Sequence, residues 1–456
     1  MRKILPENLL RLANVCPRPL YVVGGSVRDF LACLSLNRAT KAWDWDISSP
    51  MPAEAFEHLA KSQGFVVKST FRNTGTVKLQ DKDGIEYEYT CFRSDKYVRG
   101  IHVPVESYFT DDIRLDALRR DFTANAVYYD LQKGVFVDPL NDGLAAISEK
   151  RLSTVAPAEK VFGEDGLRLL RLARQAAQSG FAPDRECLQG ATQNAALIQD
   201  ISSERIFTEF TALLNADQKH GVQDGHYRGL RILEQTGVLR YILPELTLGK
   251  GMSQRADFHN YDVLEHSFRA VLYVDPRVRF AALLHDVGKP ACAISDGNTY
   301  EHATQGAAIA KTILQRLKAP KRFTERVCQL VQYHMYDFNC QTGENKLRRF
   351  FVTHSELLED LLLLKQADFS ACKDDLAVAP TCARWRALLS KMRLENTPFS
   401  LKELALTGKD VLELGAPPAT VAGVLNALLL HTATEPKDNV KERLLRLAKG
   451  YLKQIR

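Results

Sequence analysis

The 456-residue chain has no long, uninterrupted apolar run. Its most apolar stretch, residues 357–368, is short and broken by acidic side chains, so the sequence predicts no membrane-spanning helix. The amino-terminal segment is typical of an amphipathic helix and not of a signal peptide, because charges and Pro6 interrupt its apolar residues. The nine cysteines form no Cys-x-x-Cys pair, which disfavours a disulfide framework or a zinc ribbon. These absences predict a cytoplasmic protein with reduced thiols and no membrane partner.

The charge balance is also unremarkable for a globular protein. The net charge of +6 permits nucleic-acid binding but does not demonstrate it. The length exceeds what one compact core holds, so we expect several domains.

The two ends of the chain carry different patterns. Residues 1–150 alternate helix and strand signals, with strands expected at 20–23, 65–68, 75–79 and 85–92 and a loop at 96–104. After residue 159 strand signals nearly vanish and apolar residues recur at helical spacing. The predicted fold class is α+β, in which an α/β head with a mixed sheet is followed by all-helical domains.

The densest local signal is a glycine pair followed by two carboxylates. Gly24 and Gly25 end the strand at 20–23, and Arg28 lies in the first turn of the next predicted helix. Asp44 and Asp46 alternate along a second strand, so both point to one face. Backbone N–H groups near a helix start suit a triphosphate, and paired carboxylates suit two Mg²⁺ ions bound to it. Either motif alone is usually a turn or a solvated strand end, but together they predict a nucleotidyl-transfer site.

Five further segments follow in a consistent order, at residues 71–77, 88–93, 119–125, 164–171 and 203–210. With the glycine and carboxylate motifs, they make residues 20–215 resemble the class II nucleotidyltransferases. That group comprises the bacterial CCA-adding tRNA nucleotidyltransferases and the bacterial poly(A) polymerases. The resemblance implies that Asp44 and Asp46 are catalytic, and it leaves the role of Glu88 open.

The resemblance also implies the nucleotide-binding residues. Forked guanidinium donors at Arg28 and Arg120 suit phosphate oxygens, and Asp121 suits ribose hydroxyls. Asn125 belongs to the same ribose and phosphate motif as Arg120 and Asp121.

The resemblance also implies a second group of residues that select the base. This group comprises Glu164, Asp165, Arg168 and Arg171. We expect Asp165 and Arg168 to share one helical face, with Glu164 holding Arg168 in place. A carboxylate accepts from an exocyclic amine and a guanidinium donates to a ring nitrogen or carbonyl. Such a pair would accept cytosine and adenine and reject uracil and guanine.

Downstream, the sequence 283–290 carries a His285-Asp286 pair and resembles the HD metal-dependent phosphohydrolases. The resemblance implies a divalent transition-metal site formed by His266, His285, Asp286 and Asp368, to which His302 and His334 would add a second. The alternative is that these histidines are helix caps and polar packing. Whether the domain is a hydrolase or a scaffold is left open.

These patterns predict a head at residues 1–150, a helical neck at 151–255, an HD domain at 256–375 and a helical tail at 376–456 with a tRNA-binding role. The expected function is addition of C, C and A to tRNA 3′ ends from CTP and ATP, with Mg²⁺ in the head. An A-adding enzyme and a poly(A) polymerase are alternatives within the family. Two further alternatives are an HD phosphohydrolase whose head only binds RNA, and a non-catalytic RNA chaperone. The oligomeric state is not predicted.

Overall fold

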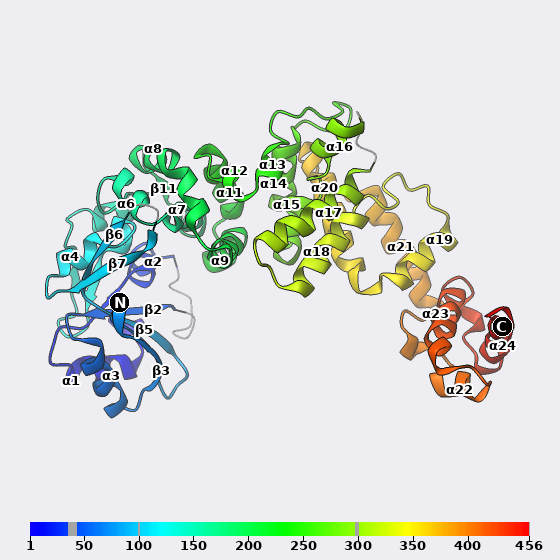
Figure 1. Cartoon of the computed structure of the whole chain (residues 1–456), viewed down its shortest axis with the longest axis horizontal. Coiled ribbons are helices and arrows are strands. Elements are labelled where there is room, and N and C mark those ends of the chain that lie inside the picture. The colour runs from blue at the N-terminus through cyan, green and yellow to red at the C-terminus, as the bar shows by residue number, and fades with distance from the viewer. Residues whose placement is uncertain (35–42, 99–100, 297–300, 456) are drawn as a thin grey trace. The chain divides into compact units, whose positions relative to one another are not determined.

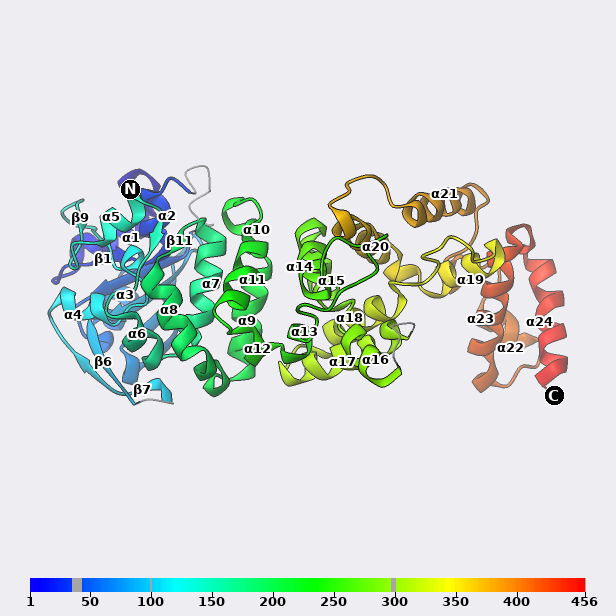
Figure 2. The same cartoon turned by 90° about the horizontal axis from the view of Figure 1, so that it is seen from above.

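A computed structural model describes residues 1–34, 43–98, 101–296 and 301–455. The chain divides into two compact units, Met1–Thr247 and Leu248–Arg456, and each is described by itself. Figures 1 and 2 show a sheet-containing first unit and a helical second unit. No helix within the described ranges is both long and apolar enough to cross a membrane.

A seven-stranded mixed sheet organises the head. Its strand order is β3-β4-β5-β2-β1-β8-β9, and only β2 and β5 among neighbouring strands run parallel. The strands are β1 Tyr21–Val23, β2 Trp45–Ser49, β3 Val66–Phe71, β4 Thr76–Gln80, β5 Glu86–Cys91, β8 Tyr128–Asp130 and β9 Phe136–Val137. The helices are α1 Glu7–Val15, α2 Gly25–Leu31, α3 Ala53–Ser62, α4 Ile113–Leu118 and α5 Gly143–Ser148. This confirms the predicted mixed-sheet head.

The head core lies on the faces of the central strands. Trp45 and Tyr89 are buried, and the ring of Tyr89 stacks on Phe56 of α3 with 3.6 Å between centroids. Alternation along β2 turns Trp45 and Ile47 inward and leaves Asp46 facing solvent. Core packing therefore fixes which face of β2 carries the carboxylate.

The prediction of a loop at residues 96–104 is wrong for the described part of that range. Strands β6 Arg93–Val98 and β7 Ile101–Phe109 form a separate antiparallel hairpin, in which Lys96 pairs with Glu106. Residues 99–100 lie outside the described chain. Pro104 is compatible with this hairpin because a two-stranded sheet consists only of edge strands, where a missing N–H is tolerated.

The neck is a set of helices that pack on one another, with α7 against both α9 and α11 (Figure 2). Its helices are α6 Ala158–Glu164, α7 Leu167–Ser179, α8 Arg185–Asn194, α9 Ser203–Leu214, α10 Asp217–His220, α11 Gly225–Gln235, α12 Leu239–Ile242 and α13 Pro244–Thr247. The expectation of an all-helical neck needs one correction. Strands β10 Arg151–Leu152 and β11 Ala182–Pro183 form a short parallel pair, too brief to leave a periodic signal.

The second unit is helical throughout its described residues. Helix α14 Val263–Tyr273 packs on α20 Leu358–Lys373, and α17 His302–Arg316 packs on α18 Lys321–Tyr333. The other helices are α15 Arg279–Leu284, α16 Lys289–Asp296, α19 Glu344–Thr353, α21 Pro380–Leu394, α22 Gly408–Glu413, α23 Pro418–Thr434 and α24 Lys441–Ile455. Helix α14 begins where the Asp262 carboxylate accepts a hydrogen bond from the backbone N–H of Glu265.

Candidate active site and metal cluster

A polar pocket of about 380 Å³ opens between the head sheet and the neck helices, within the first unit. We call it the head–neck pocket. Its basic lining residues are Arg28, Arg93, Arg119, Arg120, Arg168, Arg171, Arg174, Arg205 and Lys219. Its acidic lining residues are Asp44, Asp46, Asp95, Asp121 and Asp165. The excess of cations suits a polyanionic ligand.

Asp44 and Asp46 both line this pocket, although β2 begins at Trp45 and the strand therefore contains only Asp46 of the two. Gly24 has a φ of +82°, and a Cβ atom there would lie 3.1 Å from Asp46 Oδ2. The first glycine is therefore required both for its backbone conformation and for the close approach of the carboxylate. Gly25 opens helix α2 and also lines the pocket.

The Asp46 carboxylate sits in an environment that disfavours its charge. Solvent reaches it, but protein surrounds its other sides, and this burial raises its pKa to about 6. The carboxylates of Glu88 and Asp44 raise the pKa further, whereas Arg120 opposes them. Glu88 stands beside Asp46 in the register of β5 on β2. Such crowding of carboxylates favours a bound cation.

A network of buried polar side chains supports the pocket below the carboxylates. Arg28 Nη1 donates to Asn125 Oδ1 at 2.7 Å and to Gln175 Oε1 at 3.0 Å. Asn125 Nδ2 donates to Asp121 Oδ1 at 2.9 Å. Arg171 Nη2 donates to Asp121 Oδ2 at 2.7 Å. The structure thus brings together four of the predicted nucleotide-binding residues.

The charges within this network are balanced. Burial would raise the pKa of Asp121, but Arg171 and the hydrogen bond from Asn125 outweigh it and hold that pKa well below its usual value. Arg120 lies nearby and donates from Nε to Tyr128 Oη at 3.0 Å and from Nη2 to Asp116 Oδ2 at 3.0 Å. Each guanidinium is therefore held in a fixed orientation.

The expectation that Asp165 and Arg168 share a helical face is wrong. Helix α6 ends at Glu164, and Asp165 is extended, with a φ of −146° and a ψ of 106°. The Asp165 carboxylate accepts a hydrogen bond from the backbone N–H of Leu167, a local bond that competes with continuation of the helix. Gly166 beside it is closely packed, because a Cβ atom there would lie 2.4 Å from the carbonyl oxygen of Leu197. Both side chains nevertheless line the head–neck pocket.

Arg168 is held as expected by Glu164, with Nη1 3.1 Å from Glu164 Oε2. The guanidinium also donates to the carbonyl oxygens of Val161 at 3.0 Å and Arg119 at 2.7 Å. Its Cζ atom lies 5.6 Å from the ring centroid of Tyr97 in the hairpin. Asp165 accepts a hydrogen bond from the N–H of Leu167 and lies 3.7 Å from Arg205 Nη2.

Several pocket residues were not predicted from the sequence. Arg174, Gln175 and Gln178 join Arg168 and Arg171 along α7 and all line the pocket. Their spacing of three and four residues forms a polar stripe on an otherwise apolar helix, which was the available signal. Lys219 Nζ lies 2.9 Å from Asp44 Oδ2, and His220 Nε2 lies 2.9 Å from Asp29 Oδ2. No local pattern connects residues so far apart in the chain.

In the second unit, six side chains converge from the helices around α14, α18 and α20. We call His266, His285, Asp286, His302, His334 and Asp368 the HD cluster. His266 Nε2 lies 3.0 Å from Asp368 Oδ1 and 3.1 Å from His285 Nε2. Asp286 reaches both halves of the cluster, with Oδ2 3.3 Å from His285 Nε2 and Oδ1 3.3 Å from His302 Nε2. Ligand-like atoms therefore form two groups, one with His266, His285 and Asp368, and one with Asp286, His302 and His334.

The histidines of the HD cluster are oriented by their outer nitrogen atoms. Nδ1 of His285 lies 2.7 Å from the carbonyl oxygen of Ala282, and Nδ1 of His334 lies 2.6 Å from that of Val331. A carbonyl can only accept, so each Nδ1 carries a hydrogen, and in the neutral ring each Nε2 presents a lone pair to the cluster. Burial disfavours a charged His285 ring, but Asp286 and Asp368 outweigh burial and raise its pKa to about 10. The arrangement is suited to two cations.

The three families that match the chain are consistent with this geometry. The Poly A polymerase head domain matches residues 20–153, the probable RNA and SrmB-binding site of polymerase A matches residues 180–248, and the HD domain matches residues 263–368. An A-adding tRNA nucleotidyltransferase of Deinococcus radiodurans is 32% identical over 434 residues, covering 89% of this chain and 90% of the relative. The chain belongs to the class II tRNA nucleotidyltransferase family.

Other members of the family extend the comparison. A CC-adding tRNA nucleotidyltransferase of Thermus thermophilus is 31% identical and covers 93% of this chain and 92% of the relative. A multifunctional CCA protein of Hahella chejuensis is 31% identical and covers 69% of this chain and 72% of the relative. The crystal structure of a Bacillus stearothermophilus CCA-adding enzyme with CTP shares the fold, with a TM-score of 0.67, 24% identity and 99% coverage of both chains. The protein is therefore a nucleotidyltransferase of a type that uses divalent metal ions.

Proposed function

We propose that the head–neck pocket adds C, C and A to the 3′ end of tRNA, using CTP and ATP and releasing pyrophosphate. The observation that carries this proposal is the placement of Asp44 and Asp46 in a pocket rich in arginine. Relatives named as tRNA nucleotidyltransferases that match nearly the whole chain support the choice of tRNA as the acceptor.

Asp44 and Asp46 would hold Mg²⁺ in this proposal. The fit rests on the crowding of Asp46 by Glu88 and Asp44, which raises its pKa, and on the Cβ-free cradle at Gly24. Bound Mg²⁺ would activate the 3′ hydroxyl of the acceptor and neutralise the pyrophosphate leaving group. Lys219 places a cation against Asp44 in the structure, and we propose that it turns to a phosphate oxygen when a metal ion takes that place.

The remaining side chains would bind and select the nucleotide. Arg28 and Arg120 would orient the phosphates, and Asp121 with Asn125 and Arg171 would hold the ribose. Arg168 would donate to the base, because Glu164 and two backbone carbonyls fix its guanidinium. Asp165 would accept a hydrogen bond from the exocyclic amine of cytosine or adenine, at the position where uracil and guanine present a carbonyl oxygen.

Two other activities of the family are alternatives to full CCA addition. The relatives that match about nine-tenths of the chain carry the names A-adding and CC-adding, whereas the multifunctional CCA protein matches 69% of it. An A-adding enzyme is the leading alternative, and poly(A) synthesis is the other. We test acceptor choice with tRNA lacking its terminal CCA and with an unstructured oligoadenylate, both given CTP and ATP. We expect only the tRNA to be extended, by three nucleotides. Long adenylate tails on both acceptors would contradict the proposal.

The chain would divide this work among a head at 1–150, a neck at 151–255, an HD domain at 256–375 and a tail at 376–456. In the tail, the basic helix α24 would contact tRNA phosphates. We place the activity in the cytoplasm, where tRNA and nucleoside triphosphates meet.

The HD cluster supports a second candidate function. Its two groups of nitrogen and oxygen ligands suit transition metal ions, which would supply a metal-activated water for phosphate-ester hydrolysis. We propose 2′,3′-cyclic phosphate or a similar damaged tRNA end as the substrate. Hydrolysis of a cyclic phosphate by the Mn²⁺- or Ni²⁺-loaded protein would support this, and its absence with every metal would make the domain a scaffold.

A further inference from the structure

One edge of the His266 ring faces away from the HD cluster. Its Nε2 atom belongs to the cluster, but its Nδ1 atom is buried and has no hydrogen-bond partner among the described residues. This differs from His285 and His334, whose Nδ1 atoms each bond to a backbone carbonyl. A buried polar atom without a partner is rare and indicates a missing water or ion.

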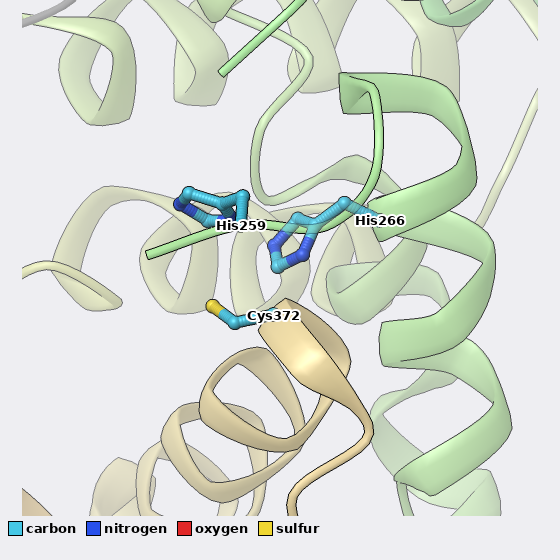
Figure 3. A group of neighbouring side chains, drawn as sticks. All are labelled: His259, His266 and Cys372. Atoms are coloured by element: carbon cyan, nitrogen blue, oxygen red, sulfur yellow. The ribbon is translucent and has the colours of Figure 1, made fainter. Parts of the chain in front are cut away.

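His259 and Cys372 lie beside His266 (Figure 3). The Nδ1 atom of His259 is also buried and, within the described chain, unpartnered. The rings of His259 and His266 meet edge to face, with 4.9 Å between their centroids. One ligand atom from each of these three residues lies within 4.8 Å of the other two. We call His259, His266 and Cys372 the thiol cluster.

The backbone holds the members of the thiol cluster together. The N–H of Asn260 donates to the carbonyl oxygen of Cys372 at 2.9 Å, which ties the loop carrying His259 to the end of α20. Lys373 Nζ donates to the carbonyl oxygen of Asp257 at 2.7 Å and adds a second tie. The loop is therefore anchored on both sides of His259, which holds that ring close to the end of α20.

We propose that the thiol cluster is a third cation site, separate from the two groups of the HD cluster, which takes a thiophilic divalent ion such as Zn²⁺. Two imidazole nitrogens and one thiolate form a ligand set that favours Zn²⁺, Co²⁺ and Cd²⁺ over Mg²⁺. Ligand atoms on a tetrahedral Zn²⁺ lie about 3.5 Å apart, so small side-chain rotations close the site. Binding releases the Cys372 thiol proton to solvent. Because His259 is only partly buried, water completes the coordination.

Sharing of His266 couples this site to the HD cluster. A neutral imidazole has one lone pair, and an ion at Nδ1 leaves the hydrogen on Nε2, where it is donated to Asp368. His266 is then lost as a ligand to the HD cluster. An ion in the thiol cluster therefore weakens cation binding in the HD cluster, whether or not that cluster hydrolyses anything.

Cobalt substitution tests the site in the full-length protein. After metal removal by chelation, Co²⁺ is added and the thiolate-to-cobalt charge-transfer absorption is recorded in the near ultraviolet. Wild type is expected to show this band, and Cys372→Ser and His259→Ala are expected to lose it. Both substitutions leave all six residues of the HD cluster in place. Cys328→Ser is the matched control, because Cys328 is also partly exposed but belongs to no group of ligand-like residues in the described chain.

A second measurement needs no substitution and so does not depend on the folding of a variant. Zn²⁺ is expected to slow alkylation of Cys372 by iodoacetamide at least tenfold, as followed by peptide mass spectrometry, with Cys328 unaffected. The proposal is overturned if wild type shows no absorption band, or if wild type and Cys372→Ser show equal bands. It is also overturned if Zn²⁺ does not change the rate of Cys372 alkylation.

Discussion

In the head–neck pocket Asp44 and Asp46 are exposed among nine cationic lining residues and only three other carboxylates, whereas in the HD cluster five of the six side chains are buried and imidazole offsets carboxylate. The first arrangement lacks negative charge, which a nucleoside triphosphate and a tRNA backbone would bring. The second brings nitrogen and oxygen atoms together in two groups of ligand-like residues. We infer that one chain holds a pocket suited to a large anionic substrate and a cluster suited to metal ions.

The largest expected effect comes from removing the charge of one carboxylate in the head–neck pocket. Asp46→Asn should lower kcat/KM for nucleotide addition by about 10²–10⁴-fold, because metal stabilisation of the transition state is worth several kcal/mol. tRNA affinity should be nearly unchanged, since basic residues that contact phosphates supply it. Asp44→Asn should behave alike. Parallel measurement of addition and filter binding checks this, and near-normal addition by a tRNA-binding variant would remove both residues from catalysis.

A smaller loss is expected at the base-selecting part of the same pocket. Asp165→Ala should narrow the preference for CTP and ATP over UTP and GTP by about 1–3 kcal/mol, by analogy with side-chain readout of base edges. The measurement is kcat/KM for all four nucleotides on tRNA that ends before the CCA. Arg205→Ala is the comparison variant, because it removes the cation 3.7 Å from Asp165 and leaves the Asp165 carboxylate in place. An unchanged nucleotide ranking in Asp165→Ala would show that selection lies elsewhere.

The comparison also predicts that the two sites act independently. The double variant His285→Ala with Asp286→Ala should lose the metal ions bound by the HD cluster, as measured by elemental analysis, together with any hydrolase activity. Nucleotide addition should change by less than about twofold, because the two sites belong to different compact units and share no side chain. Asp286→Asn gives the same test with less disturbance of the buried core. A large loss of addition in a folded variant would show that the sites are coupled.

A further expected effect concerns the pH dependence of nucleotide addition. Since the pKa of Asp46 is raised to about 6, the carboxylate gains a proton as the pH falls through that value and loses its hold on a cation. At sub-saturating Mg²⁺, addition should fall about tenfold per pH unit below pH 6. Glu88→Gln removes a neighbouring negative charge and should move this acid limb to lower pH by less than about one unit. An acid limb that does not move would show that another group titrates.

The sequence predicted the parts of the molecule that local spacing controls. A spacing of two residues predicts that Asp44 and Asp46 lie close together, and the structure has both in one pocket, although Asp44 precedes β2. The spacing of Asp165 and Arg168 does not predict their arrangement, because Asp165 is extended between two helices.

Other features depend on long-range packing. Lys219 meets Asp44 across the head and neck without any local signal. The sequence predicts a loop at residues 96–104, where β6 and β7 form a hairpin, because the glycine and proline in this range obscure the alternating pattern of a strand. His259 carries no motif of its own, and only the folded loop brings it to His266 and Cys372.

Stepwise addition of single nucleotides tests the central claim most directly. Purified protein is given tRNA that ends before the CCA, after the first C or after the second C, with one nucleoside triphosphate at a time. The account predicts two additions from CTP to the first tRNA, one to the second, and a single A from ATP only on the third. Addition of A alone to the third tRNA, with no use of CTP, would contradict it and identify an A-adding enzyme.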